Sequence, residues 1–237
     1  SGLLNVLAPR PVQWRGVNKL IDRVVNELSY EERGESYSEY LLKRDLEASY
    51  PNVVNREQEI QRHITDRQKY KNNSQNLSIL LQYAAGFGKS YVACWTASYL
   101  KDLMDSQKKY AYKKIFILTD RLDLKEQMFE NIKAMNINSS LIKSITTRTE
   151  LHHALLDIDM HRIIIVNLQK FQNSGSFFEQ EINRLKDDRF AFIIDEIHRS
   201  NDGTMHDNFK SIFEDIDNSI SNNKRNLIVG VTATPTE

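Results

Sequence analysis

From residue 77 onward, short apolar runs rich in β-branched residues alternate with helical patterns, and this alternation is the strongest constraint on the fold. Continuous apolar strands between amphipathic helices are typical of a parallel sheet with helices on both faces. The sequence therefore predicts an α/β fold. The expected strands are 77–81, 115–119, 141–145, 163–168, 190–194 and 227–231. The expected helices between them are 89–104, 122–135, 148–157 and 206–218.

The sequence before residue 77 has a different character. Residues 13–28 repeat apolar side chains at helical spacing, which predicts an amphipathic helix. Residues 30–76 are dense in charge and poor in long apolar runs, so two polar helices are expected, at about 36–48 and 53–70. A solvated, flexible excursion is the alternative for the part near 70–75.

We therefore divide the chain into an N-terminal helical segment, 1–76, with a charged helical insertion at 30–76, and a main domain, 77–237. The chain begins with Ser1-Gly2 rather than Met and stops shortly after the last expected strand. We expect it to be a piece of a longer protein.

Composition excludes several classes of protein. Lys+Arg and Asp+Glu balance at 32 each, so a nucleic-acid site would have to be a local patch. The single cysteine, Cys94, excludes a disulfide framework and a cysteine-cluster metal site. No apolar run reaches the roughly 18 residues of a membrane span, so we expect a soluble cytoplasmic protein with no membrane partner.

The segment after the first expected strand ends in Gly-Lys-Ser, as in the phosphate-binding loop G-x-x-x-x-G-K-[ST], although Tyr83 occupies the first glycine position. Gly86 and Gly88 allow backbone N–H groups to face phosphate oxygens. Lys89 would reach the β- and γ-phosphates, and the Ser90 hydroxyl would bind Mg²⁺. A glycine-rich turn without a ligand is the alternative. The expected nucleotide-binding residues are Ala85, Gly86, Phe87, Gly88, Lys89, Ser90 and Tyr91.

The strand 190–194 continues directly into Asp195-Glu196-Ile197-His198. Two adjacent carboxylates at the end of a buried strand are costly unless a cation meets them, and beside a phosphate loop that cation is Mg²⁺. Asp195 would then hold the metal, and Glu196 would polarise the attacking water. His198 is placed to relay between this site and neighbouring elements, although a structural role is the alternative.

The phosphate loop and Asp-Glu-Ile-His together resemble superfamily 2 helicases and translocases, whose second motif is D-E-x-[HD]. Thr232-Ala233-Thr234 matches their third motif, [ST]-A-T, which implies that Thr232 and Thr234 couple nucleotide state to DNA contact. Arg10-Pro11-Val12-Gln13 resembles their R-x-x-Q element, which implies that Arg10 and Gln13 recognise adenine. A Gln amide suits this role because it can hydrogen-bond adenine N6 and N7 at once. For Arg10 and Gln13, an ordinary helix start after proline is the alternative.

Longer stretches are similar to the restriction (R) subunit of type I restriction enzymes. Residues 117–127 resemble its T-D-R-x-x-L-x-x-Q stretch, 165–171 its I-V-x-T-x-Q-K-F, 193–200 its I-I-D-E-A-H-R-S, and 231–235 its F-T-A-T-P. The departures are Tyr83, Phe87, Asn167 for Thr, and Ile197 for Ala. None of them removes an expected phosphate or metal ligand.

The resemblance implies the first RecA-like P-loop motor domain of an ATP-dependent double-stranded DNA translocase, with ATP and Mg²⁺ as cofactors. It also implies partners: the methylation and specificity subunits, and a second motor domain and a nuclease domain in the full-length chain. The DNA contacts would come from Thr119, Arg121, Asn167 and Lys170, with surface charge as the alternative for the two basic residues.

Two further hypotheses stay open. One is another superfamily 2 enzyme, such as an RNA helicase or a remodeller, against which the 119–121 and 169–171 stretches argue. The other is a nucleotide-gated binding module without turnover, against which the intact Lys89, Asp195 and Glu196 argue. Acid and lysine pairs near 123–125 and 130–133 are expected to be surface charge and not nuclease residues.

Overall fold

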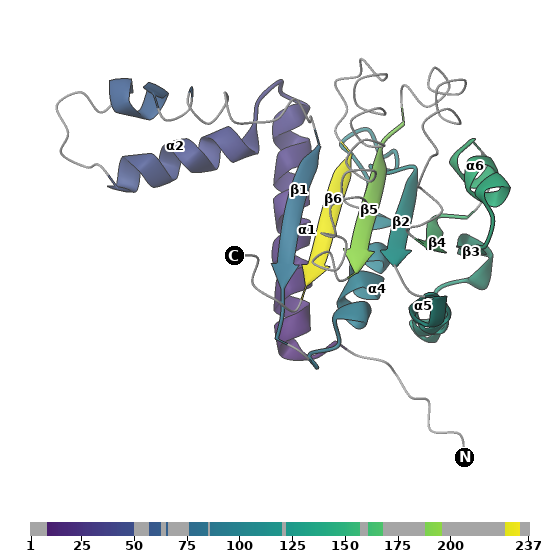
Figure 1. Cartoon of the computed structure of the whole chain (residues 1–237). Helices are drawn as coiled ribbons and strands as arrows, with labels where there is room; N and C mark the ends of the chain where they lie inside the picture. The colour runs from purple at the N-terminus through teal and green to yellow at the C-terminus, as the bar shows by residue number, and fades with distance from the viewer. Residues whose placement is uncertain are drawn as a thin grey trace. The chain divides into compact units, whose positions relative to one another are not determined.

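The computed structural model describes residues 9–49, 57–62, 65, 76–84, 86–119, 122–156, 161–167, 188–195 and 226–232. The named helices are α1 (Pro11–Glu31), α2 (Tyr37–Ser49), α4 (Lys89–Leu100), α5 (Leu122–Ala134) and α6 (Arg148–Leu156), with a 3₁₀ turn at Ser139–Leu141. The strands are β1 (Leu77–Gln82), β2 (Lys114–Thr119), β3 (Ile142–Ile145), β4 (Ile163–Asn167), β5 (Phe190–Asp195) and β6 (Leu227–Thr232) (Figure 1). The expected helix at 206–218 lies outside the described residues.

The strands form one 6-stranded sheet in the order β1-β6-β5-β2-β4-β3. Every pairing in it is parallel, and the arrows in Figure 1 all point the same way. Strands β2, β4 and β5 are buried at every residue, as expected for strands covered on both faces. The structure therefore confirms the α/β fold expected from the alternating pattern.

Strand β1 lies at an edge of the sheet and alternates between half-buried and exposed residues. Leu80 on this strand is 47% exposed. An edge strand has a neighbour on one side only, so fewer side chains cover it. The apolar run of β1 therefore resembles that of a central strand in sequence but not in burial.

Helices α4 and α5 pack against the central strands and against one another: α4 contacts β2, β5 and β6, and α5 contacts β2, β3 and β4. Each connects a strand to one further along the sheet in the same direction, whereas α6 connects β3 back to β4. Because crossovers between parallel strands are right-handed, this reversal places α6 on the opposite face. Helices thus cover both faces.

Helix α4 ends at Leu100, several residues before the expected end at 104, and the side chain of Arg162 binds the chain that follows. The Arg162 guanidinium donates to the carbonyls of Lys101 at 2.7 Å, Tyr112 at 2.8 Å and Lys113 at 2.8 Å. It also lies 3.8 Å from the ring centroid of Tyr110.

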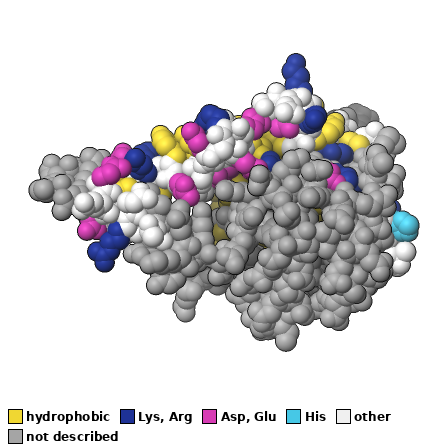
Figure 2. Space-filling view, turned by 90° about the horizontal axis from the view of Figure 1, so that it is seen from above, with side chains coloured by type: hydrophobic (Ala, Val, Ile, Leu, Met, Phe, Trp, Pro, Cys, Tyr) yellow, Lys and Arg dark blue, Asp and Glu magenta, His cyan; other side chains and the backbone are white. Residues whose placement is uncertain are grey.

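The residues divide by contacts into two compact units, 1–21 with 75–237 and 22–74, so the division falls inside α1. The domain organisation expected from the sequence, with a boundary at residue 76, stays a prediction. Within the described residues, no helix is both long and apolar enough to cross a bilayer. The described part of the face in Figure 2 carries basic and acidic side chains interspersed, in keeping with the balanced composition.

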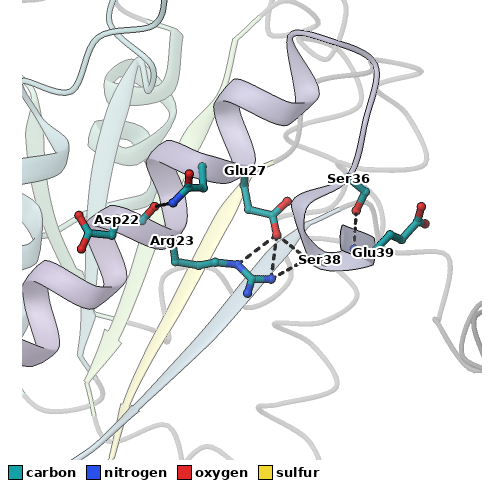
Figure 3. Close-up of polar contacts among 7 residues, drawn as sticks. Asp22, Arg23, Glu27, Ser36, Ser38 and Glu39 are labelled. Atoms are coloured by element: carbon teal, nitrogen blue, oxygen red, sulfur yellow. Dashed lines mark hydrogen bonds and ion pairs between the residues drawn. The ribbon is translucent and has the colours of Figure 1, made fainter. Parts of the chain in front are cut away.

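The unit 22–74 contains a buried carboxylate at its centre, Glu27, which is 5% exposed. Arg23 donates to Glu27 Oε1 from Nε at 3.1 Å and from Nη2 at 2.8 Å, and Nη2 also donates to the Ser38 hydroxyl at 2.7 Å. The Ser38 hydroxyl in turn donates to Glu27, so α1 and α2 share one polar network (Figure 3). Charged helices of this kind are held together by paired groups where apolar area is small.

We expect Arg23→Ala to destabilise this unit, because Glu27 would keep its burial and lose its cationic partner. The loss should be about 1–3 kcal/mol in the free energy of opening. Hydrogen exchange of peptides from α1 and α2 measures it. Arg44→Ala is the matched control, since Arg44 and Asp45 are an exposed pair at 58% and 66% side-chain exposure, and it should leave exchange unchanged. Equal protection in both variants would contradict the role of the network.

Candidate nucleotide-binding site

The carboxyl ends of the strands lie along one edge of the sheet, because all the strands are parallel. Asp195 at the end of β5 is the register partner of Val231 on β6, and Thr232 is the partner of Gln82 on β1. The backbone N–H of Tyr83 then donates to the Thr232 carbonyl at 3.0 Å. The start of the predicted phosphate loop is therefore bonded to the strand that carries the expected coupling residue Thr232.

The phosphate loop turns through two glycines in left-handed backbone conformations, Gly86 with φ 79° and Gly88 with φ 70°. Residues with a Cβ rarely adopt such values, which explains why glycine stands at both positions. Helix α4 begins at the next residue, Lys89, and no side chain caps its N-terminus. An uncapped helix N-terminus after a glycine-rich loop presents N–H groups and the positive end of the helix dipole, and this arrangement fits a phosphate.

The two expected metal ligands lie in contact. The Ser90 hydroxyl donates to Asp195 Oδ2 at 3.1 Å, across 105 residues of sequence, and Asp195 is 5% exposed. A hydroxyl and a carboxylate supply the hard oxygen atoms that Mg²⁺ prefers. The residues present therefore fit a magnesium ion held between the loop and β5. Among the described residues, His, Cys, Asp and Glu form no group of three or more that could hold a metal by themselves.

Cys94 lies on α4, one turn beyond Ser90, and is completely buried. Burial raises the pKa of its thiol, and the negative charge of Asp195 raises it further. The thiol is therefore held in its protonated form by burial and by the nearby carboxylate.

Gln13 on α1 contacts the phosphate loop directly and is 4% exposed. Its Nε2 donates to the Phe87 carbonyl at 2.6 Å and to the Gly88 carbonyl at 3.4 Å. Its Oε1 accepts from the backbone N–H of Arg10 at 2.8 Å, which closes the first turn of the helix as in a capping box. The R-x-x-Q resemblance predicts Gln13 at the nucleotide site, but the sequence does not predict its hydrogen bonds with the loop backbone. The proposed binding of adenine by Arg10 and Gln13 stays a prediction.

Two of the expected DNA-contact residues are brought together by the sheet. Thr119 ends β2, Asn167 ends β4, and the two are register partners. They are 1% and 3% exposed, so both side chains are buried at the rim of the sheet. Their contact with DNA stays a prediction. The remaining expected site residues that lie outside the described residues are Ala85, Arg121, Lys170, Glu196, His198 and Thr234.

We expect Asp195→Asn to weaken the binding of Mg²⁺ in the presence of ADP by at least about tenfold, because an anionic ligand becomes a neutral one. Titration calorimetry with MgCl₂ measures the change. Glu130→Gln on α5 is the control, since it makes the same change of charge at an exposed position. An unchanged magnesium affinity in Asp195→Asn would remove Asp195 from the metal site.

Comparison with solved structures gives matches to helicases at low sequence identity. The DEAD-box helicase Mss116 bound to ssRNA and UDP-BeF has a TM-score of 0.49 and 14% identity, and the match covers 70% of this chain and 33% of that one. The helicase domain of Hef from Pyrococcus furiosus has 0.45 and 16%, covering 73% and 33%. The UvsW helicase from bacteriophage T4 has 0.42 and 16%, covering 67% and 47%. The chain thus spans one third to one half of these structures.

No curated protein sequence matches the chain. A family model does, over residues 7–237: ResIII, described as type III restriction enzyme, res subunit. This match extends over almost all of the sequence, from the helix that contacts the phosphate loop to the segment beyond β6. The chain therefore belongs to the ResIII family and is a helicase-like motor domain of superfamily 2, with the RecA-like α/β fold that its sequence predicts.

Proposed function

We propose that this chain is the ATP-binding first motor domain of an ATP-dependent double-stranded DNA translocase, the restriction subunit of a type I restriction-modification enzyme. The observation that carries the ATP part is the 3.1 Å hydrogen bond between Ser90 and Asp195. This bond joins the glycine-containing loop at the N-terminus of α4 to the carboxylate at the end of β5. This is the pair of oxygen ligands that a magnesium–triphosphate complex requires.

Each residue of the site has a distinct role in this proposal. Lys89 places a compact positive charge at the β- and γ-phosphates, and the N-terminus of α4 stabilises the same anion. Ser90 and Asp195 hold Mg²⁺, which, when bound, neutralises charge that develops on the phosphates. Glu196 accepts a proton from the attacking water. Hydrolysis of the terminal phosphate bond then gives ADP and inorganic phosphate.

The DNA part of the proposal rests on the same rim. Thr119 and Asn167 end neighbouring strands, and Arg121 and Lys170 follow them in the sequence. Basic and neutral donors of this kind contact phosphates and position the backbone without specifying sequence. Thr232 accepts through its carbonyl from the backbone N–H of Tyr83 at the start of the loop, and this bond supports a role of the third motif in linking nucleotide state to this rim.

The assignment to type I enzymes rests on the stretches at 117–127 and 165–171, whereas the family description names type III enzymes. In the proposal, the methylation and specificity subunits are partners. A second motor domain supplies an arginine finger, and a separate nuclease domain of the full-length chain cuts the DNA. The alternatives are another superfamily 2 DNA or RNA helicase or remodeller, and a nucleotide-gated binding module without turnover.

Lys89→Ala should weaken the binding of Mg·ATP strongly, by about tenfold or more, because a charge-assisted contact to phosphate is lost. Calorimetry on the 237-residue chain measures the affinity. Lys133→Ala, which removes an exposed lysine on α5, should bind as the parent does. If Lys89→Ala binds Mg·ATP as well as the parent, the loop at 83–90 is not the nucleotide site.

Glu196→Gln in the full-length protein should keep ATP binding and lower turnover by roughly 10²–10⁴-fold, the usual effect of losing a general base. The parental ATPase should be stimulated by long double-stranded DNA and much less by RNA of equal length. Steady-state ATP hydrolysis with each nucleic acid measures both effects. Stimulation by RNA alone would favour the helicase alternative, and binding without any turnover would favour the binding module.

A further inference from the structure

Tyr83 stands at the first position of the phosphate loop, where the loop pattern has glycine. Its side chain is 8% exposed, and its buried hydroxyl has no hydrogen-bond partner among the residues that the structure describes. A buried hydroxyl without a partner costs free energy that the phenyl ring of Phe would not. Polar bonding therefore does not explain the position of this ring, and packing must.

The ring packs against Gly16, in the interior of α1. A Cβ added at Gly16 would lie 1.8 Å from the Tyr83 hydroxyl oxygen and 2.9 Å from Cζ. Glycine inside a helix costs about 1 kcal/mol relative to alanine, so its presence here needs a reason. The reason is steric: the hydroxyl end of the tyrosine side chain, its oxygen and Cζ, occupies the space where a side chain at position 16 would lie.

Gln13 lies three residues before Gly16 and therefore on the same face of α1. Its amide donates to the Phe87 carbonyl at 2.6 Å. A Cβ at Gly88 would lie 2.8 Å from Gln13 Nε2, so the approach at this point is also too close for a larger residue. One helix face thus contacts the phosphate loop at its start, through Gly16 and Tyr83, and near its end, through Gln13.

The contact at Phe87 fixes the orientation of a peptide group. In a trans peptide the carbonyl and the following N–H point in opposite directions. With the Phe87 carbonyl bonded to Gln13, the N–H of Gly88 points away from α1. This N–H belongs to the loop whose backbone donors would face a phosphate.

We propose that Tyr83 is a positioning residue of the nucleotide site: packed on Gly16, it sets α1 against the phosphate loop so that Gln13 holds the Phe87–Gly88 peptide in its orientation. This inference rests on the proposed binding of Mg·ATP at the loop. It assigns Tyr83 no contact with nucleotide. Tyr83, which departs from the loop pattern, and Gly16, which is unusual inside a helix, pack against each other, so each explains the other.

The test uses variants that change the contact from either side in the 237-residue chain. Tyr83→Ala removes the ring. Gly16→Ala places a methyl group where the hydroxyl end of Tyr83 lies. Gln13→Ala removes the amide that bonds to the Phe87 carbonyl. Tyr83→Phe keeps the ring and removes only the hydroxyl. Lys19→Gln, an exposed change on α1, is the control. Thermal unfolding and exchange of β5 peptides show whether each variant keeps its fold.

Hydrogen exchange without nucleotide is the first measurement. Peptides covering 83–90 should exchange faster in Tyr83→Ala, Gly16→Ala and Gln13→Ala, with β5 peptides unchanged, and should match the parent in Tyr83→Phe and Lys19→Gln. The double variant Gly16→Ala/Tyr83→Ala should resemble Tyr83→Ala alone, because the added methyl group then meets no ring. Parental exchange of the loop in Tyr83→Ala would overturn the proposal whether or not the chain binds ATP.

Affinity for Mg·ATP is the second measurement, with Lys89→Ala as the reference. Tyr83→Ala should bind about 3- to 10-fold more weakly than the parent, the effect of one lost hydrogen bond, and Tyr83→Phe should bind as the parent. Adding Tyr83→Ala to Gln13→Ala should cause no further loss. A merely structural tyrosine would lower the melting temperature and leave this affinity unchanged, which would overturn the inference. If parent and Lys89→Ala bind equally, the proposed function itself fails, and loop exchange still decides the positioning role.

Discussion

Parallel backbone pairing is the constraint on which the rest of this structure depends. After each strand the chain must return to the starting end of the sheet before the next strand begins. Every loop that follows a strand therefore lies at the same edge, the one formed by the carboxyl ends of the strands. That geometry brings Ser90, just after β1, to Asp195 at the end of β5, although 105 residues separate them. The meeting of these two candidate magnesium ligands from distant segments is therefore a consequence of the parallel ladder and not of any local pattern.

The second determinant is the approach of α1 to the phosphate loop. Each of two contacts between α1 and the loop pairs a glycine with a long side chain from the other element, Gly16 with Tyr83 and Gly88 with Gln13. Gln13 contributes a polar bond between these two contacts and is nearly fully buried. A loop held in this way needs less reorganisation when a charged ligand arrives, which is the general advantage of preorganised sites.

The unit 22–74 is built on a different balance of interactions. Helix α2 has no buried residue, and the buried apolar side chains among the described residues of this unit are Val24, Leu28 and Ile60. The Arg23–Glu27–Ser38 network and the contacts among Tyr30, Tyr37 and Tyr40 add polar and aromatic interactions to this small apolar set. Arg33 and Arg23 lie over the rings of Tyr30 and Tyr37, at 4.3 Å and 5.2 Å from the centroids. Paired charged residues therefore join α1 and α2 beside a small set of buried apolar side chains.

The sequence by itself determined the secondary-structure elements and located the candidate nucleotide loop, because hydrophobic periodicity and the Gly-Lys-Ser and Asp-Glu patterns are local and a few residues suffice to express them. It predicted each strand to within a residue at either end and the helices α1 and α2. The tertiary structure alone decided the strand order, the early end of α4 at Leu100, where Arg162 binds the carbonyls that follow, and the contact of Gln13 with the loop. Only the tertiary structure explains why position 16 is glycine and position 83 is tyrosine. The two residues are 67 positions apart in the sequence, and they fit each other only when they are packed together. Local periodicity specifies which face of an element is apolar, but it does not specify which distant side chain will meet that face.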